Sequence, residues 1–319
     1  MKPIQYVFLS LSAILLLWFV LYKTKSSREY DSWTNVLVRS QWITELATAC
    51  PAQGYSQGDQ DCRLDKIFNN IGTTNKYYVE YGFNSLHQCD FTGPNTCKLW
   101  KEHKWEGLLL TAEYENPEIN LHKHFLYSNN IVSIFEKYNV PKVFDYLSSD
   151  MDSHDIFVLE ALLKAGYKPR VVSTEYNSNF PIGMDLCLGD PELLGKKESE
   201  RKFTDSECIW GASAGALKEL MERYGYALIT VSTRLDLFWV RRDALPGVTI
   251  PSFEYFYPQI HVPRLTHYAQ NDWSRIPELV DWNTYAATGD IHRAQEVAMD
   301  TVKDNVRSGS TLPCFSKLK

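Results

Sequence analysis

The chain has 319 residues, of which 44% are hydrophobic and 23% are charged, a balance that allows a large core to be buried without disulfides or metals. Its formal net charge is −6, and it has no cluster of Lys and Arg interleaved with aromatic residues, which excludes a nucleic-acid-binding surface. P-loop and protein-kinase signatures are absent from the sequence, so neither class of phosphoryl-transfer enzyme is expected.

The first feature along the chain is an uncharged apolar run, IQYVFLSLSAILLLWFVLY, at residues 4–22. About twenty such residues cross the hydrocarbon core of a bilayer. The alternative, a cleaved secretory signal, is disfavoured because the polar, bulky YKTKSSREY that follows offers no small-residue cleavage site. The sequence therefore predicts an uncleaved single-pass membrane anchor at 4–22 and a polar stem at 23–40.

The side of the membrane that the main domain faces is open. More Lys and Arg follow the apolar run than precede it, which favours the cytosol, and the absence of an N-glycosylation sequon weighs against the lumen. Six of the seven cysteines lie in loop-like segments near enough to close small loops, which favours the lumen of the endoplasmic reticulum or Golgi. These pairs are Cys50 with Cys62, Cys89 with Cys97, and Cys187 with Cys208, leaving Cys314. We slightly favour the lumen and expect at least one local disulfide, Cys89–Cys97 or Cys187–Cys208 above all.

Residues 41–50 have a helical pattern, residues 51–61 form a loop rich in Gly, Gln and Asp, and strands then alternate with helices. The predicted strands are 76–83, 106–113, 123–128, 143–150 and 170–177, the predicted helices are 131–139, 153–167 and 211–226, and two further strands with a tight turn occupy 226–242. Such alternation predicts a mostly parallel sheet covered on both faces. The last two strands are antiparallel, because a parallel return needs roughly a dozen residues or more.

This organisation gives one α/β domain at 41–245, with a long insertion at 178–207, and a C-terminal extension at 246–319. The extension begins with a segment rich in Pro and aromatic residues and includes an amphipathic helix at 290–308. We expect it to pack on the α/β domain, without forming a second catalytic domain.

Acidic residues gather where two predicted strands end. Asp150, Asp152 and Asp155 follow one strand, and Glu175 lies near the end of the next. The carboxyl ends of parallel strands meet at one edge of the sheet, where ligands bind. Like charges there are costly unless a cation, a ligand or hydrogen-bond donors offset them. We therefore predict a substrate site or divalent-metal site at Asp150, Asp152 and Glu175, with Asn177 beside the acceptor.

A purely structural interpretation accounts for part of this cluster. Asp152 or Ser153 is placed to cap the helix that begins near His154, and Asp155 lies near the positive end of its dipole. His154 is open to two interpretations as well, a general base that titrates near neutral pH or a solvated residue at a helix start. Asp150 is the residue that capping does not explain.

Six segments in order resemble the eukaryotic branch of the FkbM-type methyltransferase family. They are VEYGF (79–83), WEGLLL (105–110), FEKYNVP (135–141), LSSDMDSHDIF (147–157), YKPRVVSTEYN (167–177) and GASAGALKEL (211–220). The resemblance covers about half of the chain. It implies a Rossmann-like class I methyltransferase sheet, S-adenosyl-L-methionine as cofactor and methyl transfer to oxygen. The catalytic candidates, Asp150 and His154, come from the residues themselves, and His154 stands where the family motif has asparagine.

The resemblance also implies a cofactor site around the first three strands. Its candidate residues are Glu80, Gly82, Phe83, Asn84, Ser85, Glu113, Ser128 and Asn129. Gly82 is expected to let the backbone approach the cofactor closely. The chain departs from the family pattern at Phe83, which follows Gly82 where a glycine-rich loop is usual, and at Thr111, which replaces the ribose-binding acid. We expect Glu113 to substitute for that acid.

Two functional hypotheses follow from these features. The first is a membrane-anchored, S-adenosylmethionine-dependent O-methyltransferase acting on a glycan or a small hydroxylated acceptor. The second is a catalytically inactive adaptor with the same fold, resembling the Star-like proteins of secretory-pathway trafficking. The altered loop after Gly82 favours the adaptor, and cofactor binding discriminates between the two.

Overall fold

The computed structural model describes residues 40–46, 50–52, 54–89, 93–196, 209–232, 235–260 and 277–307. Within these ranges no helix is long and apolar enough to cross a bilayer. The predicted anchor at 4–22 and all but the last residue of the predicted stem lie outside them.

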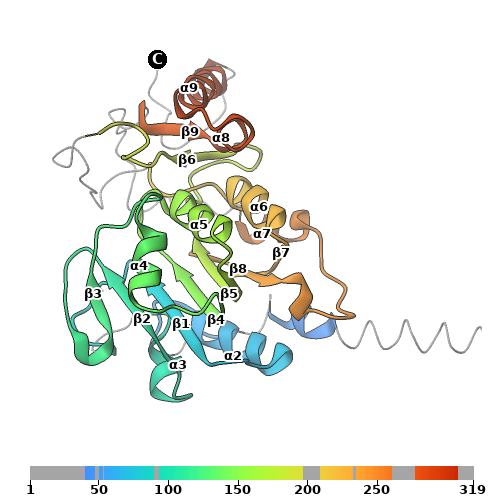
Figure 1. The fold of residues 1–319 in the computed structure, drawn as a ribbon. Coiled ribbons are helices and arrows are strands. Elements are labelled where there is room, and N and C mark those ends of the chain that lie inside the picture. The colour runs from blue at the N-terminus through green and yellow to red at the C-terminus, as the bar shows by residue number, and fades with distance from the viewer. Residues whose placement is uncertain are drawn as a thin grey trace, which may run out of the picture.

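The core of the protein is a seven-stranded sheet with the order β3-β2-β1-β4-β5-β8-β7 (Figure 1). Strands β1 to β5 are mutually parallel, whereas β8 is antiparallel to both β5 and β7. This confirms the predicted Rossmann-like α/β class with an antiparallel last hairpin, which is the sheet of class I methyltransferases. The strands are β1 (Tyr77–Tyr81), β2 (Glu106–Thr111), β3 (Leu121–Lys123), β4 (Val143–Ser149), β5 (Lys168–Glu175), β7 (Tyr226–Val231) and β8 (Asp236–Arg241).

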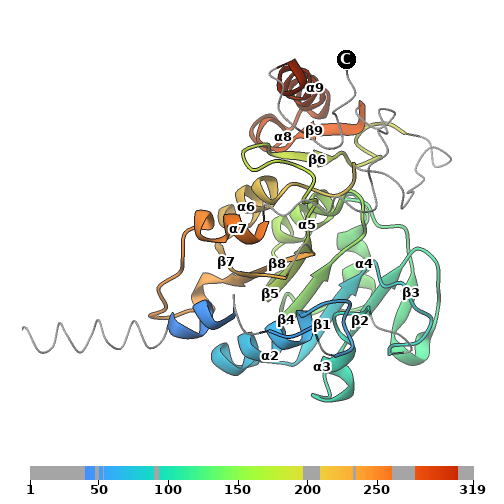
Figure 2. The ribbon, with the colours of Figure 1, turned by 180° about the vertical axis from the view of Figure 1, so that it is seen from behind.

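Helices cover both faces of the sheet, as Figures 1 and 2 show from opposite sides. Alternate residues of a strand point to opposite faces. Val79 of β1 packs in the hydrophobic cluster that includes residues of α4 (Ile131–Lys137), α5 (Asp155–Lys164) and α6 (Ala214–Arg223). Its neighbour Tyr78 packs in the cluster formed with α2 (Gln60–Ile71) and α3 (Cys97–Lys101). The buried strands are therefore apolar on both sides.

A second, two-stranded antiparallel sheet pairs β6 (Leu186–Leu188) with β9 (Leu279–Asp281). It is followed by α8 (Trp282–Thr288) and α9 (Ile291–Arg307), and Trp282 contacts Phe157 of α5 with ring centroids 5.4 Å apart. The predicted C-terminal extension thus packs on the α/β domain. The predicted boundary at 245 separates β6 from its partner strand. Residues 40–46 are helical, within the region where a helix was predicted. The short helices are α7 (Tyr257–Ile260), η1 (Pro117–Ile119), η3 (Arg242–Ala244) and η4 (Phe253–Phe256).

The structure departs from the predicted elements in short segments. The third strand is Leu121–Lys123, where 123–128 was predicted, and α2 begins at Gln60 inside the predicted loop. Helix α2 buries Leu64, Ile67 and Phe68, a helical spacing that the polar residues before it obscured. Helix α3 has too few residues to give a periodic signal.

Two of the three predicted cysteine pairs form disulfides, Cys50–Cys62 and Cys89–Cys97. Cys187 is a buried free thiol, so the predicted pairing with Cys208 is wrong. Strand β6 carries Cys187 against Val280 of β9, in the interior of the small sheet. Cys208 and Cys314 lie outside the described residues.

Candidate functional site

The order of the strands reverses at β1, which lies between β2 and β4, and ligands of open α/β sheets bind beyond the carboxyl ends of the strands at such a point. Gly82 follows β1 there, and Asp150 follows β4. Gly82 is exposed, has φ of 82°, and would place a Cβ 1.3 Å from the carbonyl oxygen of Asp150. Glycine is therefore required by the contact between the two strand ends, whether or not a ligand approaches its exposed side.

Three carboxylates converge beside this contact. One oxygen each of Asp150, Asp152 and Glu175 lies within 4.8 Å of the others, a group that could hold a metal ion. Glu175 is buried and the two aspartates are partly buried. Asp152 has φ of 55°, a left-handed conformation that is costly for residues other than glycine. The predicted convergence of these side chains is therefore present in the fold.

The electrostatics of this site disfavour three separate negative charges. Burial, and next the charge of Asp152, hold the pKa of Asp150 well above its usual range. Burial, and next the charge of Asp150, do the same for the pKa of Glu175. Because Asp150 and Glu175 are hydrogen-bonded to each other, they share a proton unless a cation takes its place. Carboxylate oxygens are the ligands that Mg²⁺ and Ca²⁺ prefer.

Asp155 has a structural role in this loop. Its carboxylate accepts hydrogen bonds from the backbone N–H groups of Met151 (2.5 Å) and Ser153 (3.0 Å). The N-cap of α5 is His154, and no side chain caps the helix there, so the predicted capping by Asp152 or Ser153 is wrong. These two hydrogen bonds hold the loop that carries Asp150 and Asp152, although burial still raises the pKa of Asp155.

His154 is buried, and both of its ring nitrogens are engaged. Nε2 lies 2.9 Å from the carbonyl oxygen of Leu126, and Nδ1 lies 2.7 Å from Oγ of Ser153. A carbonyl only accepts, so Nε2 carries the proton and Nδ1 accepts from the Ser153 hydroxyl. Tyr127 stacks on the ring with centroids 5.5 Å apart. This geometry leaves no nitrogen for a substrate, and it favours the structural interpretation over the predicted general base.

Glu80 does not face the crevice. Its carboxylate accepts hydrogen bonds from the backbone N–H groups of Asn95 (2.9 Å) and Thr96 (3.1 Å) and from the Thr96 hydroxyl. Burial raises its pKa to about 7. The carboxylate is thus committed to the segment before α3, and direct contact with a cofactor would require that segment to leave.

The remaining cofactor candidates divide into two groups. Phe83 is buried in the cluster beneath α2, and buried Ser85 donates its hydroxyl to the carbonyl of His87 at 2.7 Å. The backbone N–H of Ser128 donates to Asp190 at 2.9 Å. In contrast, the exposed candidates are Gly82, Asn84, Glu113 and Asn129, which follow the ends of β1, β2 and β3. Those four are open to a ligand.

Asn177 does not line a pocket. It is fully buried, donates its side-chain N–H to the carbonyl of Trp210 at 2.9 Å and accepts from the backbone N–H of Asn179 at 2.9 Å. Its amide supports the chain after β5. Asp236, which no sequence pattern singled out, is 2% exposed and pairs in register with Glu175. Only its position at the start of the last strand signalled it.

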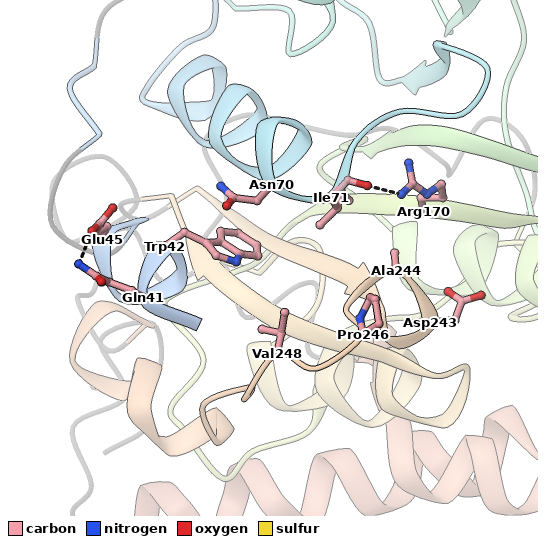
Figure 3. Close-up of a pocket in the computed structure, with 10 residues that line it drawn as sticks. All are labelled: Gln41, Trp42, Glu45, Asn70, Ile71, Arg170, Asp243, Ala244, Pro246 and Val248. Atoms are coloured by element: carbon pink, nitrogen blue, oxygen red, sulfur yellow. Dashed lines mark hydrogen bonds between the residues drawn. The ribbon is translucent and has the colours of Figure 1, made fainter. Parts of the chain in front are cut away.

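An open cavity of about 770 Å³ lies at the opposite, amino-terminal edge of the sheet (Figure 3). Trp42, Ile71 and Val248 point toward one another across it, with Arg170 and Asp243 at one side. The Arg170 guanidinium donates to the carbonyl of Ile71 at 2.8 Å, which ties β5 to the end of α2. No predicted site residue is among those that line this cavity.

No protein-family model matches the chain, and no curated protein does. Among solved structures it is similar to MycE, a methyltransferase from the mycinamycin biosynthetic pathway in complex with Mg and SAH. The identity is 14% and the TM-score is 0.37, over 67% of this chain. The chain spans 57% of that protein's length.

Proposed function

We propose that this protein is a membrane-anchored, S-adenosylmethionine-dependent methyltransferase of the FkbM type that transfers a methyl group to oxygen. The observation that carries the proposal is the convergence of three carboxylates, Asp150, Asp152 and Glu175, beside the exposed backbone of Gly82. This convergence occurs where the strand order of a methyltransferase-type sheet reverses.

The exposed residues at the ends of β1 to β3 fit the cofactor best. Gly82 and Asn84 would contact its methionine part, Glu113 would bind the ribose hydroxyls, and Asn129 would lie beside the base. S-adenosylmethionine, when bound, supplies a methyl group on a positively charged sulfur. The protein's task is then to align the acceptor oxygen with that methyl group and to keep water out.

The carboxylates serve the acceptor. Asp150, Asp152 and Glu175 would hold a divalent cation, whose positive charge favours an ionised hydroxyl nearby. When no cation is bound, burial and Asp152 raise the pKa of Asp150, so this carboxylate is then a stronger base than an exposed aspartate. Asp150 is therefore our candidate for removing the acceptor proton, in place of His154. The acceptor class is a glycan or a small hydroxylated molecule.

For the location we propose the lumen of the endoplasmic reticulum or Golgi, with residues 4–22 as the anchor. The support is the pair of disulfides, Cys50–Cys62 and Cys89–Cys97, because such bonds persist in oxidising compartments. A glycan acceptor is consistent with that compartment.

A second candidate function is the inactive adaptor. The observation that favours it is the engagement of Glu80, Phe83 and Ser85 by the protein's own interior. Three of the residues that a cofactor loop would offer are then unavailable. An adaptor with this fold needs no cofactor.

Calorimetric titration of the full-length protein in detergent with S-adenosylhomocysteine separates the two functions, with Mg²⁺ present and after EDTA. We expect binding, with Asp150→Asn within about tenfold of the native affinity, or about 1.4 kcal/mol, but without turnover. Asp243→Asn is the matched control, since it is exposed at the opposite edge. If the native protein binds nothing at millimolar cofactor, the enzyme proposal fails and the adaptor takes its place.

A further inference from the structure

Between β1 and α3 the chain makes a detour that we call the insert, residues 86–97, described except for 90–92. The Cys89–Cys97 disulfide closes it. Pro94, Asn95, Thr96 and Cys97 are all buried, although they belong to a loop and the first residue of a short helix. A loop is buried in this way only where its backbone polar groups find partners inside the protein.

The insert is attached directly beneath the proposed crevice. Asn95 and Thr96 donate to the Glu80 carboxylate, and the Asn95 side chain donates to Oγ of Ser148 at 3.0 Å. Glu80 and Ser148 are register partners in β1 and β4. Each lies two residues before a residue of the crevice edge, Gly82 or Asp150, so the insert supports both strand ends at once.

The insert is also joined to two neighbouring loops. Its first residue, Leu86, accepts a hydrogen bond at 2.9 Å from the side chain of Asn116 in the loop that follows Glu113. Gly93 donates its backbone N–H to Tyr55 at 2.8 Å, within the segment closed by the other disulfide. A displacement of the insert would therefore also displace the neighbouring loop that carries Glu113, one of the residues proposed to hold the cofactor.

No positive charge among the described residues contacts the Glu80 carboxylate. Asp236 faces it from β8, Tyr78 from its own strand and Tyr146 from β4, while Asn95 and Thr96 face it from the insert. Burial comes first among the influences that set its pKa at about 7. The carboxylate therefore titrates near neutral pH, and its ionised form accepts stronger hydrogen bonds than the neutral acid.

We propose that Glu80 is a positioning residue, whose ionised carboxylate fixes the insert beneath the crevice and thereby sets the affinity for S-adenosylmethionine. This inference rests on the proposed methyltransferase function. Protonation removes one acceptor oxygen from the backbone N–H groups of Asn95 and Thr96, so the insert is held less firmly. The same protonation relieves a buried charge, so the fold as a whole becomes more stable while the crevice loosens.

The experiment measures S-adenosylhomocysteine affinity from pH 6 to pH 8 with the full-length oxidised protein in detergent. If only the ionised form is competent, affinity falls about tenfold from pH 8 to pH 6, following the ionised fraction. Glu80→Gln should remove this pH dependence, whereas Glu113→Gln, the matched control, should weaken binding equally at both pH values. A native affinity that does not change with pH, or a Glu80→Gln variant that keeps the change, overturns the inference.

Two further measurements keep the test decisive. Thr96→Val removes one hydrogen bond to the carboxylate with little change in volume, so the midpoint of the pH profile should rise, and an unmoved midpoint refutes the role of Glu80. Hydrogen exchange at the Asn95 and Thr96 amides, corrected for intrinsic rates, should lose protection from pH 8 to pH 6. This loss of protection does not require a bound cofactor. If protection is lost but no cofactor binds at any pH, only the proposed function is refuted. If protection does not change with pH, the role of Glu80 in positioning the insert is refuted.

Discussion

Strand β4 has a buried carboxylic acid, Asp145, near its amino-terminal end and is followed by a partly buried one, Asp150, and the two are held in opposite ways. At the amino-terminal end, Asp145 accepts hydrogen bonds from the backbone N–H groups of Thr74, Asn75 and Lys76 and from the Arg170 guanidinium at 3.0 Å. Burial alone would raise its pKa, but Arg170 and the backbone donors outweigh burial and lower it. The negative charge of Asp145 is therefore offset by hydrogen-bond donors and by the charge of Arg170.

Just beyond the carboxyl-terminal end, Asp150 meets Asp152 and Glu175, and its pKa is raised. Burial acts to raise the pKa of both acids, so burial does not account for the opposite shifts. The difference lies in the neighbours, donors at one end and like charges at the other. A buried acid surrounded by donors stabilises a fold, whereas a group of acids that face one another is costly and indicates a site.

The largest effect should come from Asp145→Ala, which removes the charge partner of Arg170 and leaves three backbone N–H groups without their acceptor. We expect a loss of about 3–5 kcal/mol in the free energy of unfolding at pH 7, measured by urea denaturation. Because the folded pKa of Asp145 is lowered, its contribution is present at neutral pH and is lost as pH falls through that pKa. Asp243→Ala, an exposed control, should cost little, and an equal loss in both variants would contradict this account.

Gly82 and Gly166 offer a matched pair, because both have φ of 82° but only Gly82 is in contact with another strand. Gly166→Ala meets no atom within 4 Å and should cost about 1–2 kcal/mol through the backbone conformation alone. Gly82→Ala should cost about 1–3 kcal/mol more, since the new methyl group meets the carbonyl of Asp150. Thermal unfolding of the two variants measures the difference. Equal costs in the two variants would mean that the carbonyl of Asp150 moves away from the new methyl group without loss of stability.

Asp150→Asn should increase stability at pH 7 by about 1 kcal/mol while abolishing the proposed methyl transfer. Since the folded pKa of Asp150 is raised, its charge is unfavourable above that pKa, so the variant's advantage should grow as pH rises from 4 to 8. Burial also raises the pKa of Asp155, but Asp155→Asn weakens the bonds to Met151 and Ser153, so its gain in stability should be smaller than that of Asp150→Asn. Unfolding curves across this pH range compare the two variants, and a destabilised Asp150→Asn would contradict the contrast with Asp145.

The smallest effect is expected at Asp152, whose φ of 55° is relieved in Asp152→Gly. The gain in the folded state is partly offset by the greater freedom of glycine in the unfolded chain, so we expect a change in stability below about 1 kcal/mol. Asp152→Asn, which tolerates the same conformation, serves as control for the lost charge. If Asn stabilises more than Gly, charge dominates over backbone strain at this position.

The large elements of the fold could be predicted because their signals are local. Apolar runs such as β4 and β5 and the helical spacing of α5 depend on neighbouring residues only. Gly166 and Gly225 follow α5 and α6 with positive φ, a common way for helices to end. The third strand was misplaced because β3 spans 3 residues, too short for a periodic pattern. Strand β6 was missed for the same reason, and because its partner lies at the far end of the chain.

The part of the site that could be predicted from the sequence is the part formed by residues at the ends of strands. Asp150 and Glu175 end adjacent parallel strands, so their convergence required only the topology. The direction of the other side chains depends on contacts distant in sequence. His154 bonds to Leu126, 28 residues away, and Glu80 bonds to Asn95, 15 residues away, through an insert that no periodic signal described. Sequence spacing carries no information about such partners.

The small sheet has a consequence for the order in which the chain is built. Cys187 of β6 lies beside Val280 of β9, which is 93 positions further along the chain. At about 5–20 residues per second, a ribosome needs on the order of 5–20 s to make that stretch. During this time β6 is paired only on the edge that bridges Ala212, although its three residues Leu186, Cys187 and Leu188 are apolar and end up buried. An apolar strand with an open edge readily pairs with other chains. The nascent protein therefore depends on β9 being completed promptly, and a chain that stops before residue 279 would keep the other edge of β6 open permanently.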